Sequence, residues 1–196
     1  MSPSCEDNVR KGFFEREQFD AVLSHLPEHL TPVVKVACIT GWRVTSELLS
    51  RQWQHVDFNG GWLRLEPGET KNRKGRNFPF TQRLRTVLAE QRKRTAAVEV
   101  ATGCAVPWVF HRDGHRIKSF YVLWRKACRE TGIPGRLLHD FRRTAVRNFE
   151  RAGVPRSDAM AMVGHLTESI YRRYAISDEG SLREAAARLD TLFTQE

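Results

Sequence analysis

The stretch GHLTESIYRRYAI, at 164–176, combines a histidine, two tyrosines and two arginines near the end of the chain. A phenol among guanidinium groups can act as a nucleophile toward a phosphate, although tyrosines are also ordinary packing residues of amphipathic helices. His165 and Tyr174 are nine residues apart, so one continuous helix would place them on opposite faces. Gly164 can end one helix, and Thr167 or Ser169 can cap the next. The segment therefore predicts His165 in a turn and the tyrosines on a short helix after it.

A second segment, HDFRR, can add hydrogen-bond donors to such a site. His139 and Arg142 are three residues apart, and a helix would present both on one face. An imidazole beside a guanidinium suits a site where negative charge develops on an oxygen. Arg143 is four residues from His139 and competes with Arg142 by spacing alone. The alternative interpretation is a helix N-terminus with scattered polar residues.

Two further segments contribute a guanidinium and an ammonium. Arg43 and Glu47, in TGWRVTSELL, are four residues apart and share a face if a helix begins this early. The carboxylate would then orient the guanidinium and leave its planar fork free for phosphate oxygens. Taken alone, this pair is more simply a surface ion pair. Lys71, in TKNRKGR, can serve as a point charge or a proton donor, and the alternative is a solvated hairpin tip.

The composition indicates a folded globular chain with a polyanionic partner. Of 196 residues, 40% are hydrophobic and 28% are charged, and the formal net charge is +9. Basic residues gather at 71–94, whereas the last twenty residues lean acidic. A solvated basic face without a partner is the alternative. Four cysteines without close pairing predict free thiols in a reducing cytoplasm, and neither a signal peptide nor a bilayer-spanning apolar run is visible.

The spacing of apolar residues predicts a single domain that is mainly α with a small antiparallel β-hairpin or sheet, an α+β class. Two short strands are expected around a polar turn within 60–81, and an extended segment at 107–110. Helices are expected over 14–26, 29–41, 44–53, 81–100, 117–131, 138–153, 155–164, 167–176 and 178–193. Thr45 or Ser46 would cap the helix over 44–53.

Taken in the order in which they occur along the chain, the four polar segments resemble the catalytic domain of the tyrosine recombinase (phage integrase) family. That family carries an arginine in a TG-x-R box, a lysine on a β-hairpin, an H-x-x-R box, and GH with a tyrosine nine residues on. The corresponding segments here are TGWR, TK, HDFR, and GH followed by Tyr174. The resemblance covers about 13–189, and the combination of H-x-x-R with GH-x(8)-Y is highly specific.

The resemblance implies a role for each matched residue. Tyr174 corresponds to the nucleophile, whereas Tyr171 would pack or hydrogen-bond nearby. The other catalytic positions are Arg43, Lys71, His139, Arg142 and His165, with Glu47 in support. Residues expected to contact DNA are Arg73, Lys74, Arg76 and Arg143. Lys74 rivals Lys71 as the general acid, because hairpin lengths vary.

The implied activity is site-specific recombination or integration of DNA, as in mobile elements, by a cytoplasmic, nucleoid-associated protein. The tyrosine would cut a strand of double-stranded DNA through a 3′-phosphotyrosine and rejoin it without metal, cofactor or ATP. A helix at 178–196 would dock on a neighbouring subunit of a synaptic tetramer or fold back onto its own domain. The alternatives are a non-catalytic or truncated DNA-binding module and a type IB topoisomerase.

Some features depart from the family pattern. Three residues, instead of the usual two, separate Arg43 from Glu47, and Arg143 stands where the family often has histidine. The N-terminal domain that clamps DNA is expected to be absent, because the chain begins almost at the catalytic domain. His111 and His115, in HRDGH, invite a zinc interpretation, but no cysteine lies at finger spacing and a solvated turn is expected.

Overall fold

The computed structural model describes residues 12–69, 74–175, 182–183, 186–187 and 190. Over these residues the fold is mainly helical with small antiparallel sheets, which confirms the predicted fold class. The α-helices are α1 (Arg16–Ser24), α2 (Thr31–Thr40), α3 (Gln82–Thr102), α4 (Tyr121–Glu130), α5 (Asp140–Arg151), α6 (Arg156–Val163) and α7 (Glu168–Arg172). The strands are β1 (Val56–Asp57), β2 (Trp62–Leu65), β3 (Arg76–Pro79), β4 (His111–Arg112) and β5 (His115–Arg116). Short turns of helix are η1 (Glu28–Leu30), η2 (Val44–Leu48) and η3 (Trp53–His55).

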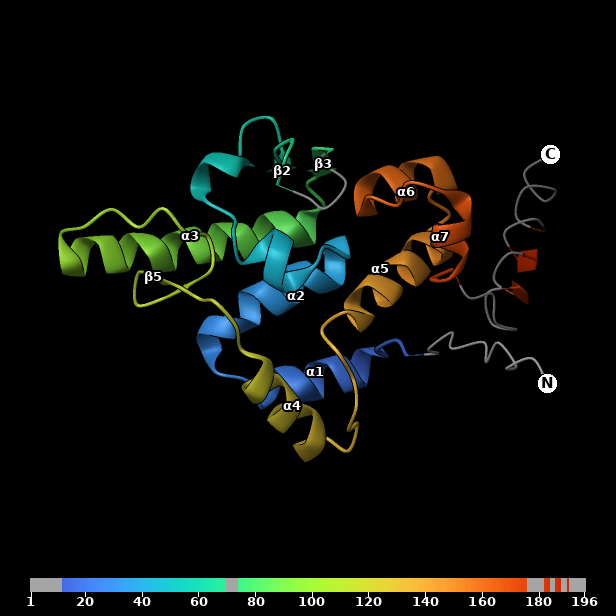
Figure 1. Ribbon diagram of the computed structural model, residues 1–196, viewed down its shortest axis with the longest axis horizontal. Helices are drawn as coiled ribbons and strands as arrows, with labels where there is room; N and C mark the ends of the chain where they lie inside the picture. Colours follow the sequence, from blue (N-terminus) through green and yellow to red (C-terminus); the bar gives the residue numbers. More distant parts are fainter. Residues whose placement is uncertain (1–11, 70–73, 176–181, 184–185, 188–189, 191–196) are drawn as a thin grey trace, which may run out of the picture.

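Helix α2 lies at the centre of the fold, where it packs against α3 and α5 (Figure 1). Val33, Val34 and Val36 are fully buried, as expected for a helix that neighbours enclose on several sides. Pro32 lies in the first turn, where its missing N–H leaves no hydrogen bond unmade. Gly41 ends the helix in the left-handed conformation, at φ +68°. The end of this central helix therefore sets where the next residues of the TGWR segment lie.

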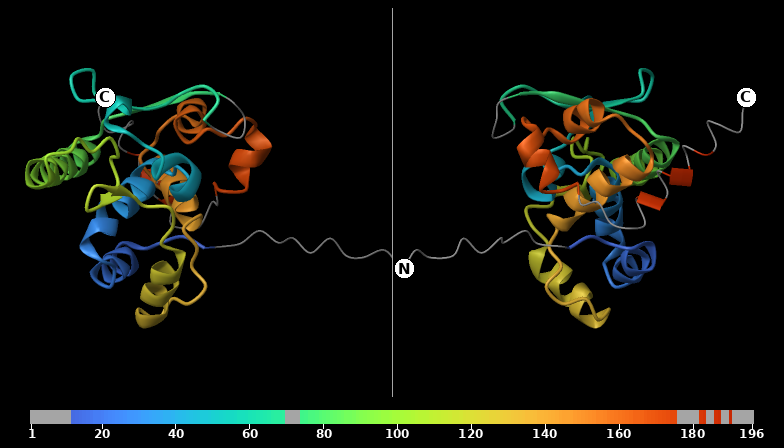
Figure 2. Two further views of the ribbon diagram at one scale, coloured as in Figure 1. Left: turned by 60° about the vertical axis from the view of Figure 1, so that its left-hand side comes forward. Right: turned by 90° about the vertical axis from the view of Figure 1, so that its right-hand side faces the viewer.

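Strands β1, β2 and β3 form an antiparallel sheet in that order. Leu63 of β2 pairs with Phe78 of β3, and both side chains are fully buried. Because side chains alternate along a strand, the two strands present one face to the core and one outward. This sheet lies on one side of the molecule and α4 lies on the opposite side (Figures 1 and 2). The two strands predicted around the polar turn are confirmed, while residues 70–73 of that turn lie outside the described part.

The helix predicted over 44–53 is wrong in its extent and in its cap. The structure has one π-helical turn, η2, in which the Leu48 N–H bonds to the Arg43 carbonyl at 3.0 Å. A π-turn contains one residue more than an α-turn. Neither predicted hydroxyl caps η2, because the Glu47 carboxylate accepts the Arg43 N–H at 2.7 Å instead. The additional residue between Arg43 and Glu47 is thus absorbed in the π-turn, and the two side chains still meet.

Helices α5, α6 and α7 follow one another through glycine turns. Gly164 ends α6 in the left-handed conformation, at φ +82°. Thr167 then caps α7, where its hydroxyl accepts the Ile170 N–H at 3.3 Å. The predicted break between His165 and the tyrosines is therefore confirmed. Helix α7 is shorter than expected, because the Tyr174 N–H bonds three residues back, to the Tyr171 carbonyl, in a tighter turn.

Other predicted boundaries also differ from the structure. Helix α4 begins at Tyr121 rather than near 117, and the extended segment at 107–110 forms only an isolated bridge between Gln52 and Trp108. HRDGH forms the hairpin β4–β5 instead of a simple solvated turn, since His111 is buried and lies 2.9 Å from the Thr95 hydroxyl. Most of the helix expected at 178–193 lies outside the described residues.

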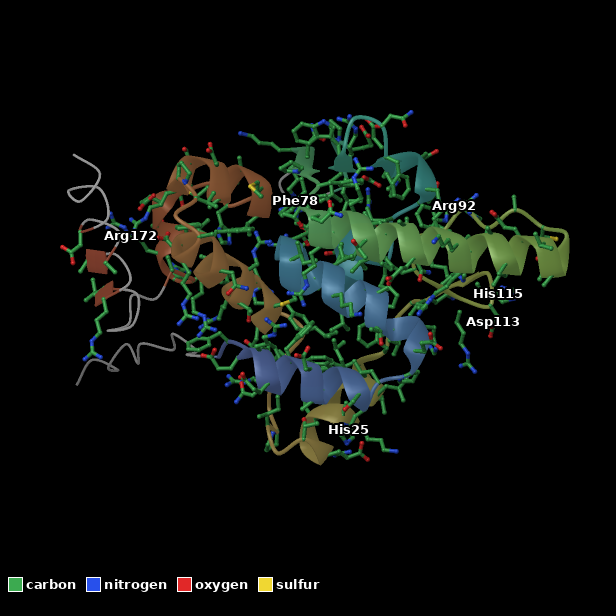
Figure 3. All side chains as sticks on the ribbon, turned by 180° about the vertical axis from the view of Figure 1, so that it is seen from behind. His25, Phe78, Arg92, Asp113, His115 and Arg172 are labelled. Carbon is green, nitrogen blue, oxygen red and sulfur yellow. The ribbon has the colours of Figure 1, made fainter. Side chains whose placement is uncertain are left out.

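The long dimension of the molecule separates the β4–β5 hairpin from α7. Figure 3 shows Asp113 and His115 at one end and Arg172 of α7 at the other. HRDGH therefore lies away from the segment that carries the tyrosines. Among the described residues, no helix combines the length and the apolar character that crossing a bilayer requires.

Candidate active site

Four of the expected catalytic residues line one pocket between the end of α2, the start of α5 and the α6–α7 connection. Its volume is about 410 Å³. The lining residues are Arg43, Arg142, Gly164, His165, Leu166, Ile170 and Tyr174. His139 joins the group through the Tyr174 hydroxyl. Segments far apart in the sequence meet here because α2 packs against α5 and α5 packs against α6.

Arg142 is deeply enclosed, with 2% of its surface exposed. Its Nε donates to His165 Nε2 at 3.0 Å, and its Nη1 donates to the Gly41 carbonyl at 3.0 Å. Its Nη2 has no hydrogen-bond partner within the described part of the chain. Burial lowers the pKa of Arg142 to about 10, so the guanidinium remains charged at neutral pH. A buried charged donor without a partner is suited to bind an anionic oxygen.

His165 presents a neutral imidazole to the pocket. Burial, followed by the charges of Arg142 and Arg43, lowers its pKa to about 3. Because Nε2 accepts the bond from Arg142, the neutral ring carries its hydrogen on Nδ1. This Nδ1 is buried and has no partner among the residues that the structure describes. His165 can therefore donate a hydrogen bond to a ligand without adding charge.

Glu47 orients Arg43, another residue that lines the pocket. Its Oε1 accepts Arg43 Nη1 at 2.9 Å, and its Oε2 accepts the Arg43 N–H at 2.7 Å. The Glu47 side chain is 1% exposed, whereas that of Arg43 is 42% exposed. A buried carboxylate thus holds one edge of a guanidinium that stays accessible from the pocket.

The two tyrosines of the opening stretch have different surroundings. The Tyr174 hydroxyl lies 2.9 Å from His139 Nε2, and its ring stacks on His165 with centroids 4.7 Å apart. The Arg143 guanidinium lies over the same ring, 5.5 Å from its centroid. Tyr171 is completely buried, and this burial raises the pKa of its hydroxyl. Of the two phenols, Tyr174 is the one that lines the pocket.

His139 can take part in proton transfer at the Tyr174 hydroxyl. Partial desolvation by the surrounding protein, followed by the charges of Arg142 and Arg43, lowers the pKa of His139. The ring is therefore neutral at physiological pH. A neutral imidazole within hydrogen-bond reach of a phenol can accept its proton.

The residues expected to contact DNA do not share one environment. Lys71 and Arg73 lie outside the described residues, and Lys74 is exposed. The Arg76 side chain is only 7% exposed and contacts Glu47 and the Val163 carbonyl. These contacts were not predicted from the sequence, although a signal was present. Arg76 and Phe78 are two residues apart on one strand, so Arg76 shares the inward face of β3.

Over the described residues, no group of three His, Cys, Asp or Glu side chains is arranged to hold a metal ion. His111, the buried histidine of HRDGH, instead accepts the Gly114 N–H through Nδ1 at 3.1 Å. Together with its contact to Thr95, this bond makes His111 part of the hairpin structure.

The model of the Phage integrase family matches residues 13–180. This chain belongs to the phage integrase family. A search of curated proteins found no match. Among solved structures, this phage integrase domain is similar to XerA recombinase, with a TM-score of 0.72 and 15% identity over 95% of this chain and 66% of that one.

Two further similar structures contain DNA. The Tn1549 transposon integrase in complex with a circular intermediate DNA has a TM-score of 0.70 and 16% identity, over 93% of this chain and 67% of that one. A lambda integrase dimer bound to a COC′ core site has a TM-score of 0.67 and 14% identity, over 86% of this chain and 60% of that one. The phage integrase chain described here therefore spans about two thirds or less of these proteins, and the likeness establishes the fold.

Proposed function

We propose that this phage integrase family member is a site-specific DNA recombinase that cuts and rejoins strands through a 3′-phosphotyrosine intermediate. The observation that carries the proposal is the position of the Tyr174 hydroxyl, 2.9 Å from His139 Nε2. The same pocket contains Arg142, whose Nη2 has no partner in the described part of the chain. A nucleophile, a base and a preformed anion site are the groups that transfer of a phosphoryl group to a side chain requires.

In the cleavage step, the Tyr174 oxygen attacks the phosphorus of a DNA phosphodiester while His139 accepts the phenol proton. The bond between phosphorus and the tyrosine oxygen forms, and the bond between phosphorus and the 5′ oxygen breaks. Lys71 donates a proton to the departing 5′ oxygen. The products are a 3′-phosphotyrosine and a free 5′-hydroxyl, and attack by a 5′-hydroxyl reverses the same steps during rejoining.

Arg43, Arg142 and His165 stabilise the charge on the nonbridging oxygens. Phosphoryl transfer depends chiefly on positioning and on electrostatic stabilisation, and the two guanidinium groups supply the positive charge without a metal. The covalent intermediate conserves the energy of the broken bond, so rejoining requires no ATP. Lys74 and Arg73 would add contacts to DNA phosphates.

The partner in this proposal is double-stranded DNA, on which four copies of the chain form a synaptic complex. The lambda integrase dimer on its core site supports assembly of such a domain on DNA. The segment at 178–196 would connect neighbouring subunits in that complex. The proposed setting is a mobile element acting at the nucleoid.

Covalent trapping tests the proposal. The protein is incubated without metal with suicide substrates that carry candidate recombination sites, and a protein–DNA adduct is sought on a denaturing gel. We expect an adduct with the wild type and with Tyr171→Phe, and none with Tyr174→Phe, because only the Tyr174 hydroxyl lines the pocket. Loss of the adduct in Tyr171→Phe alone would reverse the assignment of the nucleophile. Salt-sensitive DNA binding without any adduct would favour a binding module.

A further inference from the structure

Arg76, on β3, contacts two separate parts of the site at once. Its Nη2 donates to Glu47 Oε1, and its Nη1 donates to the Val163 carbonyl. Its guanidinium also lies over the Trp42 ring, 5.5 Å from the centroid. These partners leave the side chain 7% exposed, so little of it can reach a ligand in solvent.

Glu47 connects Arg76 to Arg43. The Oε1 atom of Glu47 accepts a hydrogen bond from each guanidinium, and its Oε2 atom accepts one from the Arg43 N–H. The carboxylate is almost fully buried, so its rotamer depends on the two cations that surround it. A displacement of Arg76 would therefore turn Glu47 and, through it, the guanidinium of Arg43.

The second contact of Arg76 is at the C-terminal end of α6. The last carbonyls of a helix have no partner within the helix and need one elsewhere. The Met162 carbonyl accepts Trp42 Nε1 at 2.9 Å, and the Val163 carbonyl accepts Arg76 Nη1. Both bonds come from groups next to the Arg43 segment. The turn that presents His165 is thus tied to the part of the fold that presents Arg43.

The space beside this turn fits a planar guanidinium. A Cβ atom at Gly164 would overlap the Arg76 guanidinium, so the absence of a side chain there allows the close approach. A guanidinium can donate in two directions from one rigid group, whereas an ammonium acts as a point charge on a flexible stem. Arg76 reaches Glu47 and Val163 from two nitrogens fixed in one plane, whereas an ammonium would have to reach both acceptors from a single nitrogen.

We propose that Arg76 is a positioning residue that fixes Arg43 relative to His165, instead of a residue that contacts DNA. The inference rests on the proposed function, because it assigns Arg76 to the same phosphoryl-transfer site. The geometry makes Arg76 the link between β3, η2 and the end of α6. It predicts that loss of Arg76 slows strand cleavage while DNA affinity is preserved.

The first comparison is between the wild type and three single variants of the full chain. Arg76→Met removes the charge and both donors but retains an unbranched stem, whereas Arg76→Lys retains the charge but donates from a single nitrogen. Arg64→Met is the matched control, because Arg64 lies on the neighbouring strand β2 and pairs with Asp57, outside the pocket. Thermal unfolding, DNA affinity over a range of salt concentrations, and the single-turnover rate of adduct formation are measured for each.

We expect Arg76→Met to slow adduct formation by about 10- to 100-fold, since small displacements of catalytic groups have effects of this size. Its DNA affinity should stay within about threefold of the wild type. Arg76→Lys should be intermediate, and Arg64→Met should resemble the wild type. Combining Arg76→Met with Glu47→Gln should add little to the slower single variant, because both act through Arg43.

A neutral substrate separates positioning from a general loss of structure. A methylphosphonate at the scissile position lacks one negative oxygen, so it depends less on a guanidinium. The defect of Arg76→Met relative to the wild type should shrink by at least about threefold on this substrate, as it should for Arg43→Ala. A variant that is merely misfolded would show the same defect, relative to the wild type, on both substrates.

The outcomes distinguish this inference from the proposed function. Wild-type cleavage with an equal rate in Arg76→Met would overturn the positioning role alone. A weaker salt dependence of binding with an unchanged cleavage rate would assign Arg76 to DNA contact instead. If Arg76→Met does not fold, Arg76→Lys decides, and a wild-type rate in it would overturn the role. Absence of an adduct in the wild type would refute the proposed function, and the positioning role with it.

Discussion

At the scale of single residues, the pocket combines charged guanidinium groups with neutral imidazoles. Arg142 keeps its charge at neutral pH, whereas burial and the nearby arginines lower the pKa of His165 to about 3. The pKa of His139 is lowered by the same kind of environment. Two imidazolium rings beside these arginines would repel them, so the fold favours the neutral rings. The arginines can then hold phosphate while the histidines donate or accept protons.

Acid should destabilise the fold through His165. The pKa of this residue is 6.5 in an ordinary environment and about 3 in the fold, so the unfolded chain binds an additional proton between these values. Above pH 6.5 His165 is neutral in both states, and its lowered pKa costs no stability. As the pH falls toward 3, only the unfolded chain gains the proton, so the free energy of unfolding decreases. Denaturant titrations should therefore give a free energy of unfolding that is about 1–2 kcal/mol lower near pH ~5 than near pH ~7.5 from this residue.

The control for this pH dependence is His165→Gln, which cannot titrate. The difference in the free energy of unfolding between the two pH values should become smaller in that variant. It should not disappear, because burial also lowers the pKa of His55 and of His111. An unchanged difference would contradict the assignment to His165.

At the scale of elements, the ends of helices place the functional side chains. The end of α2 supplies the Gly41 carbonyl that Arg142 binds, and η2 returns Glu47 to Arg43 in spite of the additional residue between them. A π-turn at a functional site adjusts the direction of one side chain without changing the helices around it. The end of α2 thus holds Arg142, and the π-turn η2 holds Glu47 against Arg43.

Gly41→Ala should destabilise the protein more than Gly103→Ala. Both glycines end helices in the left-handed region, at φ +68° and +67°. A Cβ at Gly41 would lie 2.9 Å from the Ala145 Cβ, whereas a Cβ at Gly103 would have nothing within 4 Å. We expect a loss of about 2–3 kcal/mol at Gly41 and about 1 kcal/mol at Gly103, measured by chemical denaturation. Equal losses would show that the contact between α2 and α5 can relax.

At the scale of the whole molecule, the net charge favours a polyanion as the partner. The formal net charge is +9, and the pocket with its two arginines opens near α7, at the end of the molecule that is remote from Asp113 and His115 (Figure 3). Contacts from Lys and Arg to phosphates release counterions, so affinity for DNA should depend strongly on salt.

Binding to duplex DNA should weaken by at least about 100-fold between ~50 mM and ~200 mM salt. Fluorescence anisotropy with a labelled duplex measures this dependence. Tyr174→Phe is the control, because it removes the nucleophile without changing any charge, and its salt dependence should equal that of the wild type. An affinity that hardly changes with salt would argue against phosphate contacts as the main source of binding.

The sequence by itself determined the order of the motifs, the mainly helical class and several helix ends. Gly41, Gly164 and Thr167 act through local backbone and capping preferences, which do not depend on distant residues. The break between His165 and Tyr174 followed from helical periodicity together with Gly164 and the capping candidates before the tyrosines. These features are local, so the order of amino acids is sufficient to predict them.

Tertiary structure decided which neighbouring side chains meet. Spacing left Arg142 and Arg143 equivalent, and the packing of α5 against α2 and α6 placed Arg142 in the pocket and Arg143 over the Tyr174 ring. The burial of Tyr171, and the contacts that Arg76 makes with Glu47 and with the Val163 carbonyl, also depend on elements distant in the sequence. The physical reason is that burial and ion pairing are set by the facing surface of another element, which no local pattern contains.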